Sequence, residues 1–523
     1  MLSKVLSYGL NGLDGFLVGI EADISAGLCK FDIVGLADTA IKESKDRVKS
    51  AIKNSGLNYP IDSITINLAP ADKKKEGPLY DLPIAISLLC ANGTIDVKAV
   101  KDIVFFGELS LDGSVKKVNG VLPMLISARS NGYKNFILPK ENYYEASFID
   151  GINIYVANNL NEIVQHFNKE NPTPLEKVKT SDYTAIQKEG LSNIIDMKNV
   201  KGQAQAKRAL EIAAAGGHNI LMIGPPGSGK TLLARCFAGI LPDMTFEEAL
   251  EVTKIHSIAG ILDDKTGIII NRPFRTPHHT ATTIALAGGG KDAKPGEISL
   301  AHNGVLFLDE LPEYNRQFLE VLRQPLEDGQ ITVARNKMTV TYPSSFIMVA
   351  SMNPCPCGNY GSKTQVCRCT PQQIHKYLAK LSGPIMDRID LHVEVDSITY
   401  DDLSSKAEEE CSEDIKKRVN KARDIQLNRF TNDKIYSNAK MNVVQTKKYC
   451  KLEPAAENML KIAFDKLKMS ARAHDRILKV ARTIADLDNS EIIKVSHIAE
   501  AINYRSLDRK YWIWKFTQKK KKH

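Results

Sequence analysis

The sequence predicts an α/β protein of several domains, built around a P-loop core. Three observations predict this class. Residues 1–168 alternate strand and helix patterns, a glycine-rich loop at Gly224–Thr231 lies between an apolar strand and a helix, and residues 400–510 are mostly helical. The length of 523 residues favours about three domains, because a single core rarely extends beyond roughly 300 residues.

The composition is that of an ordinary globular protein, with 43% hydrophobic and 25% charged residues, which excludes a fibrous or disordered chain. No apolar run reaches the roughly 18 residues that a membrane span needs, and the N-terminus lacks the apolar stretch of a secretory signal. We therefore expect a cytoplasmic protein without a membrane partner. The net charge of +9 includes the lysines of Lys519–Lys522, so it permits nucleic-acid binding without requiring it.

Residues 1–168 are expected to form a compact α/β domain. The strand patterns are alternating or apolar, and the helix patterns place apolar residues on one face. The expected strands are Phe16–Ile24, Phe31–Val34, Ser63–Leu68 and Ile103–Leu111, and the expected helices are Thr39–Asn54 and Asp81–Cys90. Residues 169–190 are polar and include Pro172 and Pro174, so we expect a linker there.

The glycine-rich loop fits the pattern G-x-x-x-x-G-K-[ST]. Its residues are Gly224, Pro225, Pro226, Gly227, Ser228, Gly229, Lys230 and Thr231. An apolar strand, Asn219–Ile223, precedes the loop and a helix, Leu232–Leu241, follows it, and this context separates a phosphate-binding loop from an ordinary glycine-rich turn. We expect the backbone N–H groups to surround the phosphates of ATP, with Lys230 reaching the β- and γ-phosphates and Thr231 binding Mg²⁺.

A second motif, Val305–Glu310, is an apolar strand that ends in two carboxylates. Asp309 is predicted to hold the Mg²⁺ shell, and Glu310 is predicted to polarise the attacking water. The alternative is a strand followed by an ordinary acidic turn, but its position downstream of a P-loop favours the catalytic role. A third strand, Phe346–Ala350, leads to Asn353, whose amide we expect to orient the water, although an asparagine at a strand end is otherwise a common turn residue.

Two arginine positions are candidates for stabilising charge in the transition state. Arg388 lies between Asp387 and Asp390, a pattern that is most often a surface ion pair. In a ring of ATPase subunits, however, one subunit must place a guanidinium in the site of its neighbour, and Arg388 is predicted to do so. Arg472 is expected to be the lid arginine that contacts the γ-phosphate, with Arg476, one helical turn later, as the alternative.

Together these motifs resemble the magnesium-chelatase-like AAA+ ATPases of the YifB/ComM family, over nearly the whole chain. The most specific stretches are Gly216–Thr231, Arg272–Thr280, Asn353–Gly358 and Ser470–Ala485. The resemblance implies an AAA+ ATPase core at 191–398, a helical lid or magnesium-chelatase-like C-terminal domain at 399–510, and a basic tail at 511–523. It also implies that the chain forms a homo-hexameric ring.

The resemblance further implies a β-hairpin at Gln330–Tyr342, which faces the pore and touches DNA in related rings. The residues agree, since two alternating strands flank a turn that carries Arg335 and Lys337, two cations suited to contact phosphates. The alternative is a solvated hairpin tip whose charges serve solubility. Proteins of this group act in branch migration of DNA junctions during natural transformation, so single-stranded or branched DNA is the expected partner.

Four of the nine cysteines form two C-x-C pairs in one short stretch, at Cys355, Cys357, Cys367 and Cys369. Four thiolates on a tight loop suit a tetrahedral Zn²⁺ ion, which would have a structural role here. The spacing is tighter than the C-x₂-C of most zinc ribbons, and four reduced thiols in a turn are the alternative.

The N-terminal domain resembles the protease domain of Lon, a ribosomal S5-like fold. The stretches that carry this resemblance are Ile64–Pro70, Gly77–Asp81 and Gly107–Val115. Lon-type proteolysis needs a serine just after the Gly-Pro pair and a lysine base on the later helix. Here Leu79 follows Gly77-Pro78, and the later helix, which starts at Val121, has no lysine. We therefore expect a Lon-like fold without peptidase activity.

The leading hypothesis is an ATP-hydrolysing AAA+ ring motor that acts on DNA, as a helicase or branch-migration factor of the ComM type. The alternative is a metal-insertion chaperone ATPase like magnesium chelatase, whose ATPase subunit lacks a fused Lon-like domain. An ATP-dependent protease is a third hypothesis, which the missing dyad disfavours. ATP and Mg²⁺ are the expected cofactors.

Overall fold

A computed structural model of the chain describes residues 2–187, 195–263, 265–290, 293–335, 338–362, 365–397, 409–433, 435–467, 469–505, 507 and 511. Lys337, residues 399–408 of the expected lid and residues 512–523 of the expected tail lie outside this part. The chain divides into two compact units, Met1–Gly190 with Phe246–Ile270, and Leu191–Thr245 with Asn271–His523. Among the described helices, none combines the length and apolar character that crossing a bilayer requires.

The first unit contains a mixed sheet of eight strands. In order across the sheet, the strands are β10 (Glu176–Lys177), β9 (Asn153–Ala157), β8 (Asn135–Pro139), β5 (Ile103–Phe105), β1 (Leu2–Asn11), β2 (Asp14–Ser25), β4 (Ser63–Ala69) and β3 (Lys30–Val34). The two longest strands, β1 and β2, form an antiparallel hairpin with Asn11 opposite Asp14. The turn between them requires Gly12, whose φ of 64° is costly for other residues.

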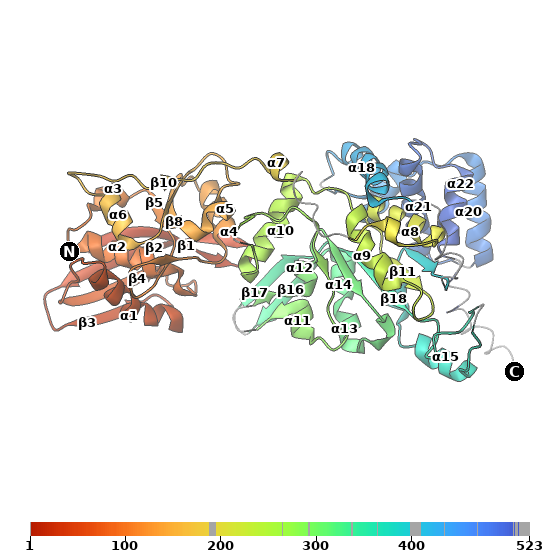
Figure 1. The fold of residues 1–523 in the computed structure, drawn as a ribbon, viewed down its shortest axis with the longest axis horizontal. Coiled ribbons are helices and arrows are strands. Elements are labelled where there is room, and N and C mark those ends of the chain that lie inside the picture. Colours follow the sequence, from red (N-terminus) through yellow and green to blue (C-terminus); the bar gives the residue numbers. More distant parts are fainter. Residues whose placement is uncertain are drawn as a thin grey trace. The chain divides into compact units, whose positions relative to one another are not determined.

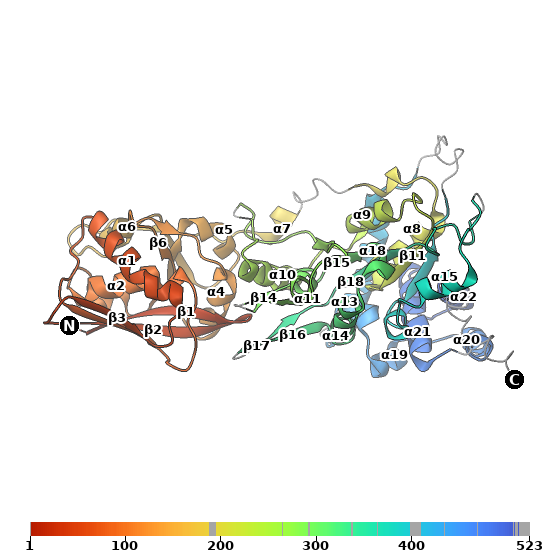
Figure 2. The same cartoon turned by 90° about the horizontal axis from the view of Figure 1, so that it is seen from below.

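Helices pack on this sheet through apolar faces. They are α1 (Thr39–Asn54), α2 (Asp81–Ala91), α3 (Val97–Val100), α4 (Val121–Ser130), α5 (Tyr143–Ala146), α6 (Leu160–His166) and α7 (Tyr183–Gln187). Figure 2 shows α1, α2 and α4 on the same side of strands β1 and β2. Helix α2 is buried along its whole length, and Asp38 begins α1 by accepting a hydrogen bond from the Ile41 N–H.

Two expectations for this region differ from the structure. The predicted strand Ile103–Leu111 is interrupted, because the chain bends at Gly107, whose N–H donates to the Leu79 carbonyl at 3.1 Å. Its second part pairs instead in a short hairpin of β6 (Glu108–Leu109) and β7 (Val115–Lys116). Within the expected linker, β10 extends the sheet by pairing with β9.

The first unit also includes helix α10 (Phe246–Ala259), although the chain on both sides of this segment belongs to the second unit. Ser257 of α10 accepts a hydrogen bond from the Gly120 N–H at 3.0 Å and donates one to the buried carboxyl of Glu145. Burial raises the pKa of Glu145, and the hydrogen bond from Ser257 opposes this shift. Residues 246–270, which we expected in the ATPase core, thus pack as part of the N-terminal unit.

The second unit contains a parallel sheet of five strands. In order, these are β12 (Phe274–Arg275), β15 (Val305–Leu308), β18 (Ile347–Met352), β11 (Ile220–Ile223) and β19 (Leu391–Glu394). Its central strands are buried runs of apolar residues, as expected for a parallel sheet covered on both faces. Because all five strands run the same way, the loops after them meet at one edge of the sheet.

Helices and two hairpins complete the ATPase-like part of this unit (Figure 1). They are α8 (Ala204–Gly216), α9 (Lys230–Ile240), α11 (Thr283–Ala287), α12 (Glu297–Leu300), α13 (Arg316–Val321), α14 (Arg323–Asp328), α15 (Pro371–Leu378), α16 (Gly383–Met386), β13 (Gly288–Gly289), β14 (Lys294–Pro295), β16 (Gln330–Arg335) and β17 (Met338–Pro343). Strands β16 and β17 confirm the expected hairpin, with Arg335 opposite Met338.

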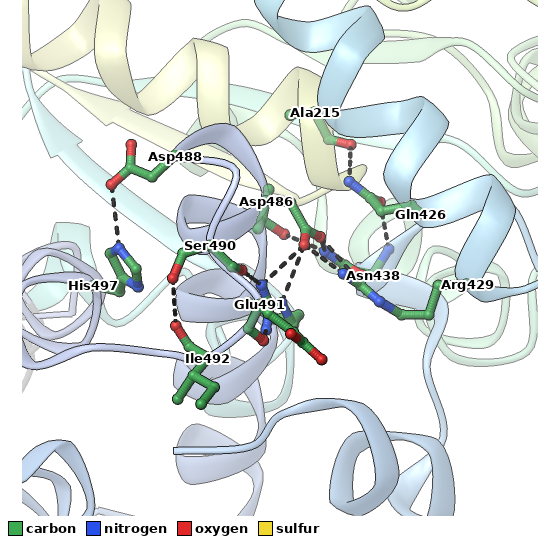
Figure 3. A network of polar contacts seen from close by, with 12 residues as sticks. Ala215, Gln426, Arg429, Asn438, Asp486, Asp488, Ser490, Glu491, Ile492 and His497 are labelled. Atoms are coloured by element: carbon green, nitrogen blue, oxygen red, sulfur yellow. Dashed lines mark hydrogen bonds and ion pairs between the residues drawn. The ribbon is translucent and has the colours of Figure 1, made fainter. Parts of the chain in front are cut away.

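The C-terminal helical region, where we expect a lid, contains helices α18 (Ser412–Arg429), α19 (Val443–Tyr449), α20 (Pro454–Leu467), α21 (Ala471–Leu487) and α22 (Val495–Asn503). A buried polar network fixes it, as Figure 3 shows. The Asp486 carboxylate accepts from Arg429, Arg482 and Asn438, and Gln426 donates to the Ala215 carbonyl of α8 at 3.0 Å. The charges of Asp486, Arg429 and Arg482 are thus paired with one another, and the contact of Gln426 joins this helical region to α8.

Candidate nucleotide-binding site

The glycine-rich loop connects β11 to α9 at the carboxyl edge of the parallel sheet. Gly227 and Gly229 have φ angles of 77° and 88°, which glycine adopts without strain. Gly224 lies so close to β19 that an added Cβ would stand 2.2 Å from the Val395 carbonyl oxygen. The loop therefore needs glycine at these positions, and it brings its backbone close to anything bound there.

Lys230 begins α9 and points back across the loop. Its ammonium donates to the carbonyl oxygens of Gly224 and Pro225, each at 2.8 Å, and to the Asn353 side-chain oxygen at 3.3 Å. Burial lowers the pKa of Lys230 to about 8, although Asp309 and Glu310 act in the opposite direction. The structure thus brings together the expected phosphate-binding lysine and the expected water-orienting amide.

Thr231 and Asp309 lie in direct contact, because the Thr231 hydroxyl donates to Asp309 Oδ2 at 2.9 Å. The other carboxylate oxygen, Oδ1, accepts from the Ser351 hydroxyl and from the Glu310 N–H at 3.1 Å. A hydroxyl beside a carboxylate at the end of a P-loop is a suitable donor set for Mg²⁺, which prefers oxygen ligands. These two residues would hold the ion while water and phosphate oxygens complete its shell.

Ser351 was not among the expected site residues. The parallel register places Leu308 beside Ala350, so the next residues, Asp309 and Ser351, are neighbours across the two strands. Ser351 stands just before Met352-Asn353 in the sequence, at the end of the strand that leads to the expected amide. Only the strand register shows that it supports Asp309.

Glu310 follows Asp309 and has a φ of 53°, in the left-handed region. A non-glycine residue in this region costs about 1 kcal/mol or more, and such strain is concentrated at functional sites. Its side chain is exposed, whereas the strand before it is buried. The backbone thus directs this carboxylate out of the sheet edge, where a water molecule can approach it.

The expected arginines lie at the opposite edge of the sheet. Arg388 precedes β19, its carbonyl accepts from the Asn219 side chain at 2.9 Å, and its guanidinium is buried against Glu327 of α14. β19 spans four residues, or about 13 Å at 3.3 Å per residue, so Arg388 is separated from the phosphate loop by the length of the strand. Arg388 therefore cannot complete the site of its own chain without a large rearrangement.

Arg472 and Arg476 belong to the same region. Arg476 pairs with Asp390 at 2.8 Å, and this ion pair and His218 hold the pKa of the Asp390 carboxyl well below its usual range although burial acts to raise it. The hydrogen bond from Arg388 lowers the pKa of Glu327, and the charges of Arg472 and Arg476 contribute to the same shift. Of the two alternatives for the lid arginine, Arg472 is exposed and Arg476 is engaged in its ion pair.

The four expected zinc ligands converge. The sulfur atoms of Cys355, Cys357, Cys367 and Cys369 all lie within 4.8 Å of one another. Burial raises the pKa of Cys355 to about 12, whereas backbone N–H groups of Asn359 and Arg368 lower the pKa of Cys357 to about 6. These N–H groups favour the thiolate form of Cys357, the form in which cysteine binds metals.

A cavity of about 680 Å³ adjoins the phosphate loop, within the size range of small-molecule sites. Its lining includes Gly224 and Pro225 of the glycine-rich loop, and Pro354, Tyr360 and Ser362, which lie close to the cysteines in the sequence. Neither Tyr360 nor Tyr511, whose hydroxyl donates to Glu394 at 2.6 Å, was expected at the site.

In the first unit, the stretch Gly77–Asp81 holds no nucleophile beside a base. Leu79 follows Gly77-Pro78 and lies in the short 3₁₀ helix Pro78–Tyr80. Asp81 is buried, accepts from Arg47 Nε at 2.7 Å and is hydrogen-bonded to Ser44. This ion pair stabilises the start of α2, and neither partner is arranged to attack a peptide.

Comparison with known proteins gives matches along most of the chain. Residues 196–403 match the family described as magnesium chelatase, subunit ChlI, residues 20–142 match subunit ChlI of Mg-chelatase, and residues 409–505 match the ChlI C-terminal family. Competence protein ComM of Haemophilus influenzae is 43% identical over 97% of this chain and 98% of the relative. The uncharacterized protein YifB of Escherichia coli is 44% identical, with the same coverage.

A magnesium-chelatase 67 kDa subunit of Chlorobaculum parvum is also similar, but at 29% identity over 31% of this chain and 24% of the relative. The similarity to ComM and YifB therefore extends across both units, whereas that to the chelatase subunit is partial. The chain belongs to the YifB/ComM family of magnesium-chelatase-like proteins, an ATPase-related family with a parallel-sheet α/β core.

Proposed function

We propose that this protein is an AAA+ ATPase that hydrolyses ATP with Mg²⁺ in a homo-hexameric ring. The observation that carries the proposal is the set of contacts from Lys230 to Asn353 and from Thr231 to Asp309 at one edge of the sheet. These contacts assemble groups for the phosphates, the metal and the attacking water within one chain. Glu310 acts as the group that polarises the water.

The place of the arginines supports the proposed ring. Arg388 and Arg472 lie near Glu327, at the edge of the sheet away from the phosphate loop. A subunit that supplies both residues to its neighbour would complete the neighbour's site, and a closed ring would give every site a donor. We therefore assign Arg388 as the transition-state arginine acting between subunits, with Arg472 as a second contact to the γ-phosphate.

We further propose that the ring acts on DNA as a helicase or branch-migration motor. The hairpin of β16 and β17 supports this, because Arg335 pairs with Met338 at the end of its two strands and Lys337 lies between these residues in the sequence. The name of the 43% identical relative, a competence protein, agrees with a role in handling DNA. Phosphate contacts from such a turn would be independent of base sequence.

The first test compares the ATPase rate without DNA and with single-stranded, duplex and branched DNA at low salt. Stimulation by DNA, and its loss in an Arg335→Ala, Lys337→Ala variant with an unchanged basal rate, would support the motor. An ATPase that no DNA stimulates, together with no DNA binding at low salt, would reject the DNA partner but keep the ATPase.

A metal-insertion chaperone is the second candidate, and the partial similarity to a chelatase subunit favours it only for part of the chain. Co-purification with a porphyrin-binding protein would support this candidate. For the N-terminal unit we propose a Lon-like fold without peptidase activity, because Leu79 replaces the nucleophile and helix α4 has no lysine. Degradation of casein that depends on a residue of this unit would contradict it.

A further inference from the structure

We propose that Cys355, Cys357, Cys367 and Cys369 bind one zinc ion, and that this zinc-bound loop forms a wall of the nucleotide pocket, so that zinc occupancy sets the affinity for nucleotide. The cysteine loop is defined here as residues 354–362 and 365–369. The identity of the pocket rests on the proposed ATPase function, whereas the metal site does not.

The sulfur geometry fits a tetrahedral metal. Cys355 Sγ lies 3.4 Å from Cys357 Sγ, and Cys367 Sγ lies 3.7 Å from each of them. Four sulfurs bound to zinc at about 2.3 Å would stand roughly 3.8 Å apart along the edges of a tetrahedron. A disulfide would need about 2.05 Å, so these spacings favour a shared ion over paired cysteines.

The backbone around the cysteines supports thiolates. The Tyr360 N–H donates to Cys355 Sγ at 3.3 Å, and the N–H groups of Asn359 and Arg368 donate to Cys357. Hydrogen bonds from N–H groups stabilise the negative charge of a metal-bound sulfur and orient it. Gly358 makes the turn between the first pair and these donors, with a φ of 81°.

The cysteine loop contacts the phosphate loop directly. A Cβ added to Gly358 would stand 2.3 Å from Pro226 Cδ, so the two backbones pack without room for a side chain. Asn353, two residues before Cys355, contacts the ammonium of Lys230. An ion that fixes the cysteines therefore also fixes the wall behind Pro226 and the position of the Asn353 amide.

The same loop encloses the cavity beside the phosphate loop. Pro354, Tyr360 and Ser362 line this space of about 680 Å³ together with Gly224 and Pro225 of the glycine-rich loop. Tyr360 also makes an edge-on ring contact with Tyr511, with the ring centroids 6.2 Å apart. Without the ion, the four cysteines would be joined only by weak thiol contacts, and the pocket would lose part of its preformed shape.

The test measures zinc and nucleotide binding separately on the full-length protein. Elemental analysis gives the metal content per chain, and titration with a fluorescent ADP in the presence of Mg²⁺ gives the Kd. We expect about one zinc per chain in the unaltered protein. The variant Cys367→Ser, Cys369→Ser should lose the zinc and bind nucleotide about tenfold more weakly, or 1.4 kcal/mol.

Two control variants and a chelation experiment separate the effect of losing zinc from the effect of misfolding. Cys411→Ser changes a cysteine at the start of α18, outside the cluster, and should retain both zinc and affinity. Tyr360→Ala keeps all four thiols and the backbone N–H, so it should retain zinc and still weaken nucleotide binding. Removing zinc from the unaltered protein with a chelator and restoring it should reverse the loss of affinity, which a misfolded variant could not do.

The outcomes are distinct. Four free thiols without metal, iron in place of zinc, or a disulfide would overturn the metal site. Zinc that can be removed without any change in Kd would overturn the link to the pocket. Stoichiometric zinc without nucleotide binding in any form of the protein would reject the proposed ATPase together with this link, and would leave the zinc site established.

Discussion

The two edges of the five-stranded sheet differ in how complete they are. At the carboxyl edge, Lys230 contacts Asn353, and Thr231 contacts Asp309, within hydrogen-bonding distance. At the amino edge, Arg388 is paired with Glu327, at the distance of a whole strand from the phosphate loop. Under the proposed function, the first edge binds the nucleotide, whereas the second supplies a cation to a neighbouring chain.

The difference between the two edges indicates that nucleotide binding and ATP hydrolysis can be separated. Groups at the carboxyl edge are held by contacts within the chain, so we expect nucleotide binding to need no partner. In the proposed ring, the cation at the amino edge would complete the charge stabilisation only when a second subunit is placed correctly. Hydrolysis would then report assembly, and changes at the two edges should have different signatures.

The largest effect is expected for Arg388→Ala. Removing a transition-state arginine costs about 10³-fold or more in rate, so ATPase activity should be lost while the Kd for ADP stays unchanged. Because the arginine acts between subunits, mixing with Glu310→Gln chains should restore activity, since the mixed ring contains sites with an intact Glu310 and a neighbour's Arg388. The doubly substituted chain, Arg388→Ala with Glu310→Gln, is the control and should rescue nothing; failure of the Glu310→Gln chains to rescue would contradict an arginine that acts between subunits.

A smaller loss, about 10²- to 10³-fold in hydrolysis, is expected for Glu310→Gln. The amide has nearly the same shape as the carboxylate but cannot polarise water, so nucleotide binding should persist and the ring should be trapped with ATP. Lys230→Ala is the contrasting variant, since it should weaken binding itself. Steady-state ATPase rates and fluorescent-nucleotide titrations of both variants check this, and a Glu310→Gln chain that fails to bind nucleotide would contradict the division of roles.

The features at the carboxyl edge that are local in sequence could be predicted. The strand before the glycine-rich loop, the helix after it and the strand Val305–Leu308 each have a continuous apolar or helical pattern with a clear end. Features that depend on the register between strands far apart in the sequence could not be predicted. Ser351 contacts Asp309 across 42 residues, and it is recognisable only when the two strands are aligned.

The least predictable features join segments that are far apart in the chain. Helix α10 lies between α9 and β12, so local patterns assign it to the ATPase core, yet Ser257 contacts Glu145, which is 112 residues away. Likewise the C-x-C spacing indicates a metal, but nothing local shows that Gly358 packs on Pro226. Such contacts result from the packing of whole layers, which single-segment patterns do not contain.

A further prediction compares the pH response of the two edges. Lys230 has a pKa of about 8 in the free site, mainly because of burial, and bound phosphate would raise it. Because the charged form of Lys230 binds phosphate, the affinity for nucleotide is highest below pH 8. The affinity falls above pH 8 as Lys230 loses its proton. Between pH 7 and pH 9 the protonated fraction falls about tenfold, and the Kd should rise by the same factor.

Titrations with a fluorescent ADP at pH 7, 8 and 9, at constant ionic strength and with Mg²⁺, measure this response. Arg388→Ala should show the same pH dependence, because an arginine stays charged throughout this range. Lys230→Arg, if it binds nucleotide, should show a flat profile. If the Kd of the unaltered protein for ADP is constant up to pH 9, the Lys230 ammonium is not the group that binds phosphate.

The smallest effect is expected for Glu327→Gln, which tests whether the ion pair with Glu327 keeps the Arg388 guanidinium from a neighbour's phosphate. Glu327 is about half exposed, with 48% of its side chain accessible, so its pair with Arg388 is worth at most about 1 kcal/mol. If this carboxylate competes with a neighbour's phosphate for the guanidinium, removing its charge should raise the ATPase rate about two- to fourfold. The increase should vanish in an Arg388→Ala background, where a double-mutant cycle of ATPase rates would show the coupling. A lower rate in Glu327→Gln alone would instead assign Glu327 to positioning Arg388 for the neighbouring site.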